Sequence, residues 1–183
     1  DRGRILLQRR KHQLFDNLWD LTAISHTLHL SKVTKVTKEP NEPKVESRDE
    51  TYQEASDRAI KVEMGIGHTT IRKIGGFNYT AKHGKNSENE YCAVLLGQYS
   101  GKIKPNKKAV YEAKKLPFSE FVQEIKEHPE AYTPWAKKGV LILEKSTVSK
   151  RFFADAQNDN KVFVEDLEGF KKEFEKYCEN YFK

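Results

Sequence analysis

The sequence predicts an α+β fold in which a mixed β-sheet is layered against helices. Segments with strand-like alternation of apolar and polar residues come first, and a helix with apolar residues three and four positions apart follows. Further strands then precede the last helices, an order typical of α+β proteins. The chain has 183 residues, 37% of them hydrophobic, which is enough for one globular domain with an appended element.

The first part of the chain predicts two strands and a long loop. Residues 4–10 (RILLQRR) are predicted to form one strand, and residues 18–24 (LWDLTAI), whose faces alternate, another. Residues 27–50 are polar and rich in Lys, Thr and Pro. We expect them to form an exposed loop rather than a structural repeat.

A helix is predicted over residues 51–64. Asp49 or Thr51 can cap its first turn, and Gly65 is a residue that ends helices. Apolar residues spaced three and four apart would form its buried stripe. These residues are Tyr52, Ala55, Ala59 and Val62.

The middle of the chain predicts a β-hairpin. Its strands would lie within residues 68–82 and 88–99, because the intervening HGKN is a favourable turn sequence. Residues 109–116 predict one more strand.

Helices are predicted for the rest of the chain. One begins at Pro117, a residue favoured in a first helical turn, and another covers residues 133–146. From Phe163 onward, aromatic and apolar residues follow one helical side. We therefore expect a main domain over residues 1–150 and a C-terminal helical extension over residues 151–183.

Charge and cysteine content narrow the function classes. The net charge of +6 suits an anionic ligand such as a diphosphate, a nucleotide or a nucleic acid. The chain has no aromatic and basic RNA-binding signature and no zinc-finger spacing, which favours a small anion over a nucleic acid. Cys92 and Cys178 lie in apolar segments and are expected to be reduced core thiols in a cytoplasmic protein.

The sequence was also searched for membrane-spanning and secretory segments. No apolar run is long enough to span a membrane, and the N-terminal residues do not resemble a secretory signal. The sequence starts at Asp1, directly before a predicted strand, so we expect further residues upstream.

Two acidic residues in the predicted hairpin are close in sequence. Glu88 and Glu90 are two positions apart, and residues two apart on a strand project to the same face. Neighbouring carboxylates repel each other, whereas a divalent cation would turn such a pair into ligands.

The predicted helix resembles the end of the Nudix box, whose usual form is R-E-U-x-E-E-x-G-U with U aliphatic. Here the segment reads RAIKVEMGI. Positions matching the box are Arg58, Ile60, Glu63, Gly65 and Ile66. Ala59 and Val62 stand where two glutamates normally bind magnesium, so ordinary Nudix hydrolysis is not implied.

Four further motifs resemble the type I isopentenyl-diphosphate isomerases of the Nudix superfamily. They are ILLQRR followed by Trp19 and His26, the pair in FNY, the segment ENEYC, and TPW. The motifs occur in the family's order, and the resemblance covers about residues 1–145. It implies the Nudix α/β/α sandwich and binding of isopentenyl or dimethylallyl diphosphate.

The resemblance also implies roles for individual residues. The family's metal ligands match His26, Glu63, Glu88 and Glu90, which implies Mg²⁺ and leaves room for a second divalent ion, Mn²⁺ or Zn²⁺. The substrate-binding positions match Arg10, Lys11, Arg58 and Trp135. The catalytic positions match Glu90, as a proton-transfer group, and Tyr79 in the pocket lining.

Ile24 departs from the family pattern. The isomerase reaction adds a proton on one face of the substrate and removes one from the other, and the family's second acid/base group is a cysteine at this position. The sequence is compatible with three functions. They are an isomerase-like protein, a Nudix hydrolase of a prenyl or nucleoside diphosphate, and a catalytically impaired diphosphate-binding module. Each would act on a small molecule, without nucleic acid or a membrane span, as a monomer or homodimer.

Overall fold

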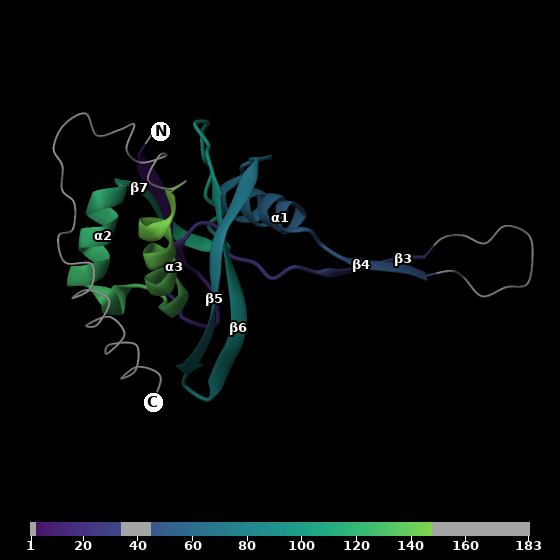
Figure 1. Ribbon diagram of the computed structural model, residues 1–183, viewed down its shortest axis with the longest axis horizontal. Coiled ribbons are helices and arrows are strands. Elements are labelled where there is room, and N and C mark those ends of the chain that lie inside the picture. The colour runs from purple at the N-terminus through teal and green to yellow at the C-terminus, as the bar shows by residue number, and fades with distance from the viewer. Residues whose placement is uncertain (1–2, 34–44, 148–183) are drawn as a thin grey trace, which may run out of the picture.

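The computed structural model describes residues 3–33 and 45–147, which form an α+β fold. In chain order the elements are β1 (Arg4–Arg10), β2 (Trp19–Leu21), β3 (His29–Val33), β4 (Val45–Asp49), α1 (Tyr52–Met64), β5 (Ile71–His83), β6 (Asn86–Gly97), β7 (Val110–Pro117), α2 (Phe118–Glu127), a 3₁₀ turn (Pro129–Ala131) and α3 (Pro134–Lys145). The predicted α+β class is confirmed. Helices α2 and α3 lie on one side of the β5–β6 hairpin and α1 on the other (Figure 1).

Strand β1 is the centre of a three-stranded antiparallel sheet in the order β2-β1-β7. Leu7 is fully buried in β1 and packs with residues of α2 and α3. The ladders between the described strands are antiparallel, and a single isolated bridge between Trp19 and Tyr132 is parallel. The mixed character that the sequence predicts is confined to that bridge in the described part of the chain.

The predicted hairpin in the middle of the chain is confirmed as β5 and β6. Its turn consists of Gly84 and Lys85, and Gly84 has a φ of 60°, which glycine adopts at little cost. The register pairs Tyr79 with Glu90 and Ala81 with Glu88. A phenol and two carboxylates therefore come from neighbouring positions of one ladder.

Helix α1 begins and ends as its sequence predicts. Thr51 is the N-cap and forms a reciprocal capping box with Glu54, while Gly65 ends the helix in the left-handed conformation. Ala55 and Ala59 are buried, which confirms that part of the predicted stripe.

The outer members of the predicted α1 stripe are wrong, because Tyr52 is 39% exposed and Val62 is 54% exposed. Met64 is fully buried instead, against Ile66 and Val110. Met64 follows Ala55 by nine residues, which places it about 180° around the helix. The last turn of α1 is therefore covered from the other side, and Val62 is left in solvent.

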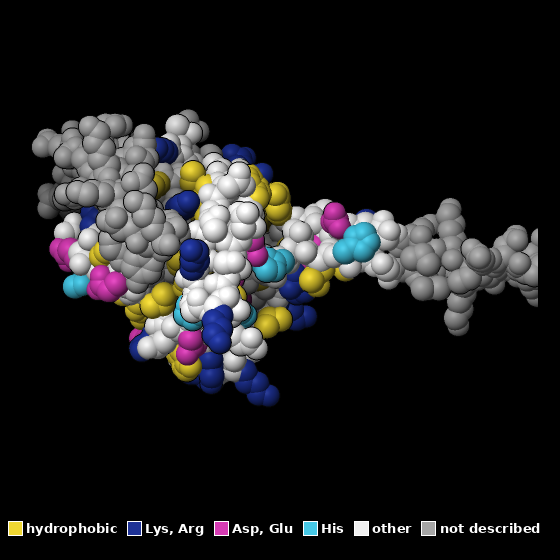
Figure 2. Space-filling model, turned by 90° about the horizontal axis from the view of Figure 1, so that it is seen from below, with side chains coloured by type: hydrophobic (Ala, Val, Ile, Leu, Met, Phe, Trp, Pro, Cys, Tyr) yellow, Lys and Arg dark blue, Asp and Glu magenta, His cyan; other side chains and the backbone are white. Residues whose placement is uncertain are grey.

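The predicted loop over residues 27–50 is wrong in its flanks, where β3 and β4 form an antiparallel hairpin that projects from the rest of the molecule (Figures 1 and 2). His29 pairs with Asp49 in the ladder, and their side chains are 2.9 Å apart. Polar residues occur on both faces of this hairpin, so it lacks the apolar alternation that marks a half-buried strand. Strand β2 is also shorter than the predicted 18–24 segment.

The last described elements agree with their predicted ranges. Pro117 precedes α2, and Thr133 caps α3 through its side chain, which accepts a hydrogen bond from the Ala136 N–H. Both helices contribute to the main core cluster, whose buried members are Leu7, Phe121, Val122, Ile125, Tyr132 and Val140. The predicted extension over residues 151–183, with Cys178, lies outside the described residues. Within the described ranges, no helix combines the length and apolar character needed to cross a membrane.

Replacement of Gly65 by alanine is expected to lower the free energy of unfolding by about 1–2 kcal/mol, because an L-residue is strained at its φ of 66°. The new Cβ would also lie 3.2 Å from the Lys104 carbonyl oxygen. Gly67→Ala is the matched control, since a Cβ there meets nothing within 4 Å. Urea unfolding of both variants tests this, and equal stability losses would contradict it.

Candidate functional site

A pocket of about 960 Å³ lies between β1, the segment after β2, α1 and the β5–β6 hairpin. Most of the predicted site residues line it. These are Arg10, Lys11, His26, Glu63, Tyr79, Glu88, Glu90 and Trp135. Arg58 is the one predicted site residue that does not. Side chains that are far apart in the sequence are thus brought around one cavity.

Tyr79 joins the two glutamates of the hairpin. Its hydroxyl donates a hydrogen bond to Glu88 at 2.9 Å and lies 3.3 Å from a Glu90 oxygen. The pairing register explains this contact, because Tyr79 lies opposite Glu90 and two positions from the partner of Glu88. Burial and the Glu88 carboxylate raise the pKa of Tyr79, so the phenol keeps its proton and acts as a donor to both carboxylates.

His26 reaches the same group of residues from the segment after β2. Its Nε2 lies 3.1 Å from each carboxylate oxygen of Glu90. His26 is 76% exposed in its side chain and Glu90 34% exposed, so the pair lies at the mouth of the pocket. We call His26, Tyr79, Glu88 and Glu90 the acidic cluster.

A second group of predicted residues meets at a buried carboxylate that the sequence analysis did not single out. Asp20 is fully buried and accepts hydrogen bonds from Arg10 at 3.1 Å and from the Trp135 indole at 2.8 Å. It also accepts from Thr133 at 3.0 Å. The Arg10 guanidinium lies 5.0 Å from the centre of the Trp135 ring. One carboxylate therefore fixes both the cation and the indole.

Asp20 could have been found from the alternation of β2. Trp19 and Leu21 flank it and pack against the main core cluster, which places Asp20 on the other face of β2, and this face is also buried. Complete burial raises the pKa of Asp20 to about 7, against the opposing effects of Arg10 and the hydrogen-bond donors.

Lys11 lies at the rim of the pocket. Its ammonium donates a hydrogen bond to the Lys107 carbonyl at 3.1 Å and lies 5.2 Å from the centre of the Tyr111 ring. The side chain is exposed, which leaves it more freedom than Arg10.

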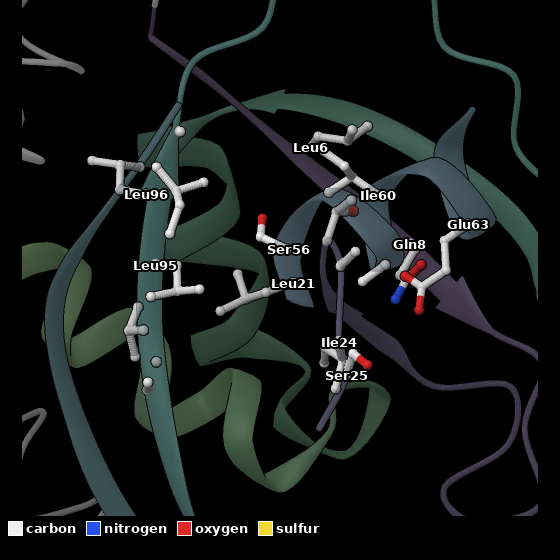
Figure 3. Close-up of a pocket in the computed structure, with 18 of the residues that line it drawn as sticks. Leu6, Gln8, Leu21, Ile24, Ser25, Ser56, Ile60, Glu63, Leu95 and Leu96 are labelled. Carbon is white, nitrogen blue, oxygen red and sulfur yellow. The ribbon is translucent and has the colours of Figure 1, made fainter. Parts of the chain in front are cut away.

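Glu63 lies across the pocket from the hairpin and points toward Gln8 (Figure 3). Burial raises the pKa of Glu63 to about 7, while hydrogen bonds from Gln8 and the Ile24 N–H lower it. Its Oε2 is buried and has no hydrogen-bond partner. A buried carboxylate oxygen without a partner is a suitable ligand for a cation.

The donor types around the pocket fit a divalent cation. Within residues 3–33 and 45–147, no three His, Cys, Asp or Glu side chains are grouped as a ready-made metal site. Mg²⁺ is commonly held by only one or two carboxylates, with water and substrate phosphates as the other ligands. The orphaned oxygen of Glu63 and the paired carboxylates of the acidic cluster supply donors of this kind.

Arg58 is occupied by protein contacts. It forms a two-pronged ion pair with Glu50, at 3.0 and 2.7 Å, and donates to Ser25 Oγ at 2.9 Å and to the His26 carbonyl at 2.7 Å. Glu50 also accepts from the Leu28 N–H at 3.0 Å. These bonds hold the segment that carries His26, so Arg58 positions a site residue from outside the pocket.

Ile24 and Cys92 are neighbours of the acidic cluster. Both pack against an apolar group formed by Phe15, Tyr79, Ala81 and Trp135. Ile24 carries no acid or base. Cys92 is a free thiol whose pKa is raised to about 11, first by burial, so it stays protonated at neutral pH.

Ala59 and Val62, the two positions that the sequence resemblance compares with glutamates, differ in their placement. Ala59 is buried and lines the pocket, whereas Val62 is exposed and does not. The α1 helix therefore directs one carboxylate, that of Glu63, into the cavity from these three positions.

Comparison with known proteins found two curated relatives. The chain is 26% identical over 155 residues to "Isopentenyl-diphosphate Delta-isomerase" of Mycolicibacterium vanbaalenii, covering 82% of this chain and 75% of that protein. It is 28% identical over 136 residues to "Isopentenyl-diphosphate Delta-isomerase 2" of Aromatoleum aromaticum, covering 73% of this chain and 61% of that protein. No family model matches the chain. These similarities support a resemblance to isopentenyl-diphosphate isomerases.

The raised pKa of Asp20 predicts a pH-dependent contribution to stability. The folded protein binds the Asp20 proton more tightly than the unfolded chain, so this contribution is present below about pH 4 and lost as the pH rises through about 7. The shift corresponds to on the order of 4 kcal/mol. Asp20→Asn should therefore show a smaller stability loss than the wild type between pH 4 and pH 8 in urea unfolding.

Asp16→Asn, at an exposed aspartate, is the control and should keep the wild-type pH dependence. If Asp20→Asn and the wild type lose stability in parallel over this range, Asp20 does not titrate as described.

Proposed function

We propose that the chain is an isopentenyl-diphosphate-isomerase-like protein. It binds isopentenyl or dimethylallyl diphosphate together with a divalent cation and transfers a proton to and from the double bond. The observation that carries this proposal is the acidic cluster, in which Tyr79 donates to Glu88 and Glu90 while His26 contacts Glu90. The two relatives, both named as isopentenyl-diphosphate isomerases, support the same substrate class.

The diphosphate would lie at the charged end of the pocket. Arg10 and Lys11 supply positive charge there, with Lys11 free enough at the rim to move toward a ligand. Glu63 and the acidic cluster would hold divalent ions. When bound, such an ion would neutralise part of the diphosphate charge and hold it beside these residues.

The alkene would lie between Trp135 and the acidic cluster. Transfer of a proton from the carboxyl group of Glu90, beside the Tyr79 hydroxyl, to the terminal carbon leaves a positive charge on the tertiary carbon and a carboxylate on Glu90. The π faces of Tyr79 and Trp135, whose ring centres are 5.6 Å apart, can stabilise that charge. The carboxylate that lost the proton can then take one back.

Ile24 limits the step after protonation. Isomerisation needs a second base on the opposite face of the substrate, and isoleucine cannot accept a proton. Glu90 alone can exchange its proton with solvent, protonate the terminal carbon and then remove a proton from that same carbon. This sequence regenerates isopentenyl diphosphate. We therefore expect proton exchange at the terminal carbon to exceed formation of dimethylallyl diphosphate.

Incubation of the protein with isopentenyl diphosphate and Mg²⁺ in deuterated water tests the proposal. Deuterium should enter the terminal methylene of the recovered substrate, as measured by mass spectrometry and NMR. Glu90→Gln should lower this exchange by about 10²–10⁴-fold, because a positioned acid/base group is lost. Glu112→Gln, at an exposed carboxylate away from the pocket, should leave it unchanged.

Ile24→Cys supplies the missing group and should increase the yield of dimethylallyl diphosphate relative to exchange.

Three results would contradict the proposal. Release of phosphate or diphosphate would identify a hydrolase, and binding without exchange would identify a diphosphate-binding module, which the apolar packing of Ile24 favours as the second candidate. If exchange persists in Glu90→Gln, the acidic cluster is not the source of the transferred proton.

A further inference from the structure

The pocket changes character along strand β6. Glu88 and every residue of β6 from Glu90 to Gly97 line it, so both faces of this strand contribute to the pocket. Strand residues rise about 3.4 Å each, so Leu96 lies roughly 20 Å beyond Glu90 along the strand. The lining therefore passes from carboxylates through a thiol to aliphatic side chains over that length.

The opposite wall is also aliphatic where β6 becomes apolar. Leu6 of β1, Leu21 of β2 and Ile60 of α1 line the pocket together with Leu95, which points toward Leu21 (Figure 3), and with Leu96. All five are only half-buried. Ser56 of α1 points into the middle of this space and is one of the small residues of the pocket (Figure 3). We call this part of the pocket the aliphatic arm.

The pocket is large for a five-carbon diphosphate. Its volume is about 960 Å³, whereas pockets for small ligands begin at about 300 Å³. Arg10 and Tyr79, from the groups proposed for the diphosphate and for the alkene, both lie beside Trp135, with 5.0 Å from the Arg10 guanidinium and 5.6 Å from the Tyr79 ring centre to the Trp135 ring centre. A five-carbon substrate bound there would leave the aliphatic arm exposed to water, which apolar surface disfavours.

We infer that the aliphatic arm holds the tail of a longer prenyl diphosphate of ten or fifteen carbons. The diphosphate lies at Arg10 and Lys11, the first double bond at Tyr79 and Glu90, and the tail along Val94, Leu95 and Leu96. The inference rests on the proposed function for the charged end and adds the chain length of the ligand. Each added isoprene unit buried in the arm should tighten binding at least about tenfold.

Binding of three probes to the full chain tests the inference. Dissociation constants of isopentenyl, geranyl and farnesyl diphosphate, each with Mg²⁺, are measured by isothermal titration calorimetry. Affinity should increase in that order. Inorganic diphosphate, which lacks the hydrocarbon tail, and farnesol, which lacks the diphosphate, are the controls. Each should bind more weakly than farnesyl diphosphate.

Ser56→Phe fills the aliphatic arm and should weaken farnesyl diphosphate at least tenfold more than isopentenyl diphosphate. Leu95→Trp, on β6 across the pocket from Ser56, is a second variant for the case that the first does not fold. It should weaken farnesyl diphosphate selectively in the same way. Ser119→Phe is the matched control on an exposed position of α2 outside the pocket.

The outcomes separate the two proposals. If isopentenyl diphosphate binds and exchanges protons but farnesyl diphosphate binds no more tightly, the inference about the tail is wrong and the proposed function stands. Equal weakening of all probes by Ser56→Phe would also overturn the inference. If none of the diphosphates binds, the proposed function itself fails.

Discussion

The register of the β5–β6 hairpin is the constraint on which the rest of the site depends. The two-residue turn at Gly84 and Lys85 places His83 opposite Asn86, and this pairing sets Tyr79 opposite Glu90. A slip by one residue would turn Glu88 and Glu90 to the other face and bring Asn89 into the pocket. Side chains alternate along a strand, so the register that places Glu88 and Glu90 on one face of β6 also places Val94 and Leu96 there, while Leu95 lines the pocket from the other face.

The carboxylates around this hairpin lie in two different environments. Asp20 is buried with four donors directed at it, so Arg10 and Trp135 are held in place before any ligand arrives. The acidic cluster is closer to solvent, and Tyr79 and His26 contact its carboxylates. The Asp20 carboxylate is thus provided with hydrogen-bond donors from within the protein. The part that retains excess negative charge is the part suited to a cation.

Short-range patterns predicted the fold well where local physical chemistry decides the structure. Thr51 with Glu54 and Gly65 determine the ends of α1, and the HGKN turn determines the hairpin. The β3–β4 hairpin was missed because its strands are polar on both faces and leave no apolar alternation. Met64 replaced Val62 in the core because the contacts of the last turn come from Ile66 and Val110, which only the tertiary structure specifies.

For the site, the sequence motifs gave residue types but could not give their partners. The meeting of His26 with Glu90 was predicted, whereas the engagement of Arg58 by Glu50, Ser25 and the His26 carbonyl was not. An arginine is a general phosphate ligand in sequence terms, and only packing shows that its donors are already used. Asp20 was overlooked for a related reason, since the carboxylate matters through contacts with residues more than a hundred positions away.

Ile24 connects the chemistry of the site to its shape. At this position a cysteine would offer a proton acceptor to the alkene, whereas the isoleucine packs with Phe15, Tyr79 and Trp135 and adds apolar surface to the pocket. That surface lines the same pocket as the acidic cluster and the aliphatic arm. Under the proposed function, an isoleucine at this position supplies no acid or base and adds to the apolar wall, and both properties would favour binding of a hydrophobic tail over rapid isomerisation of a five-carbon substrate.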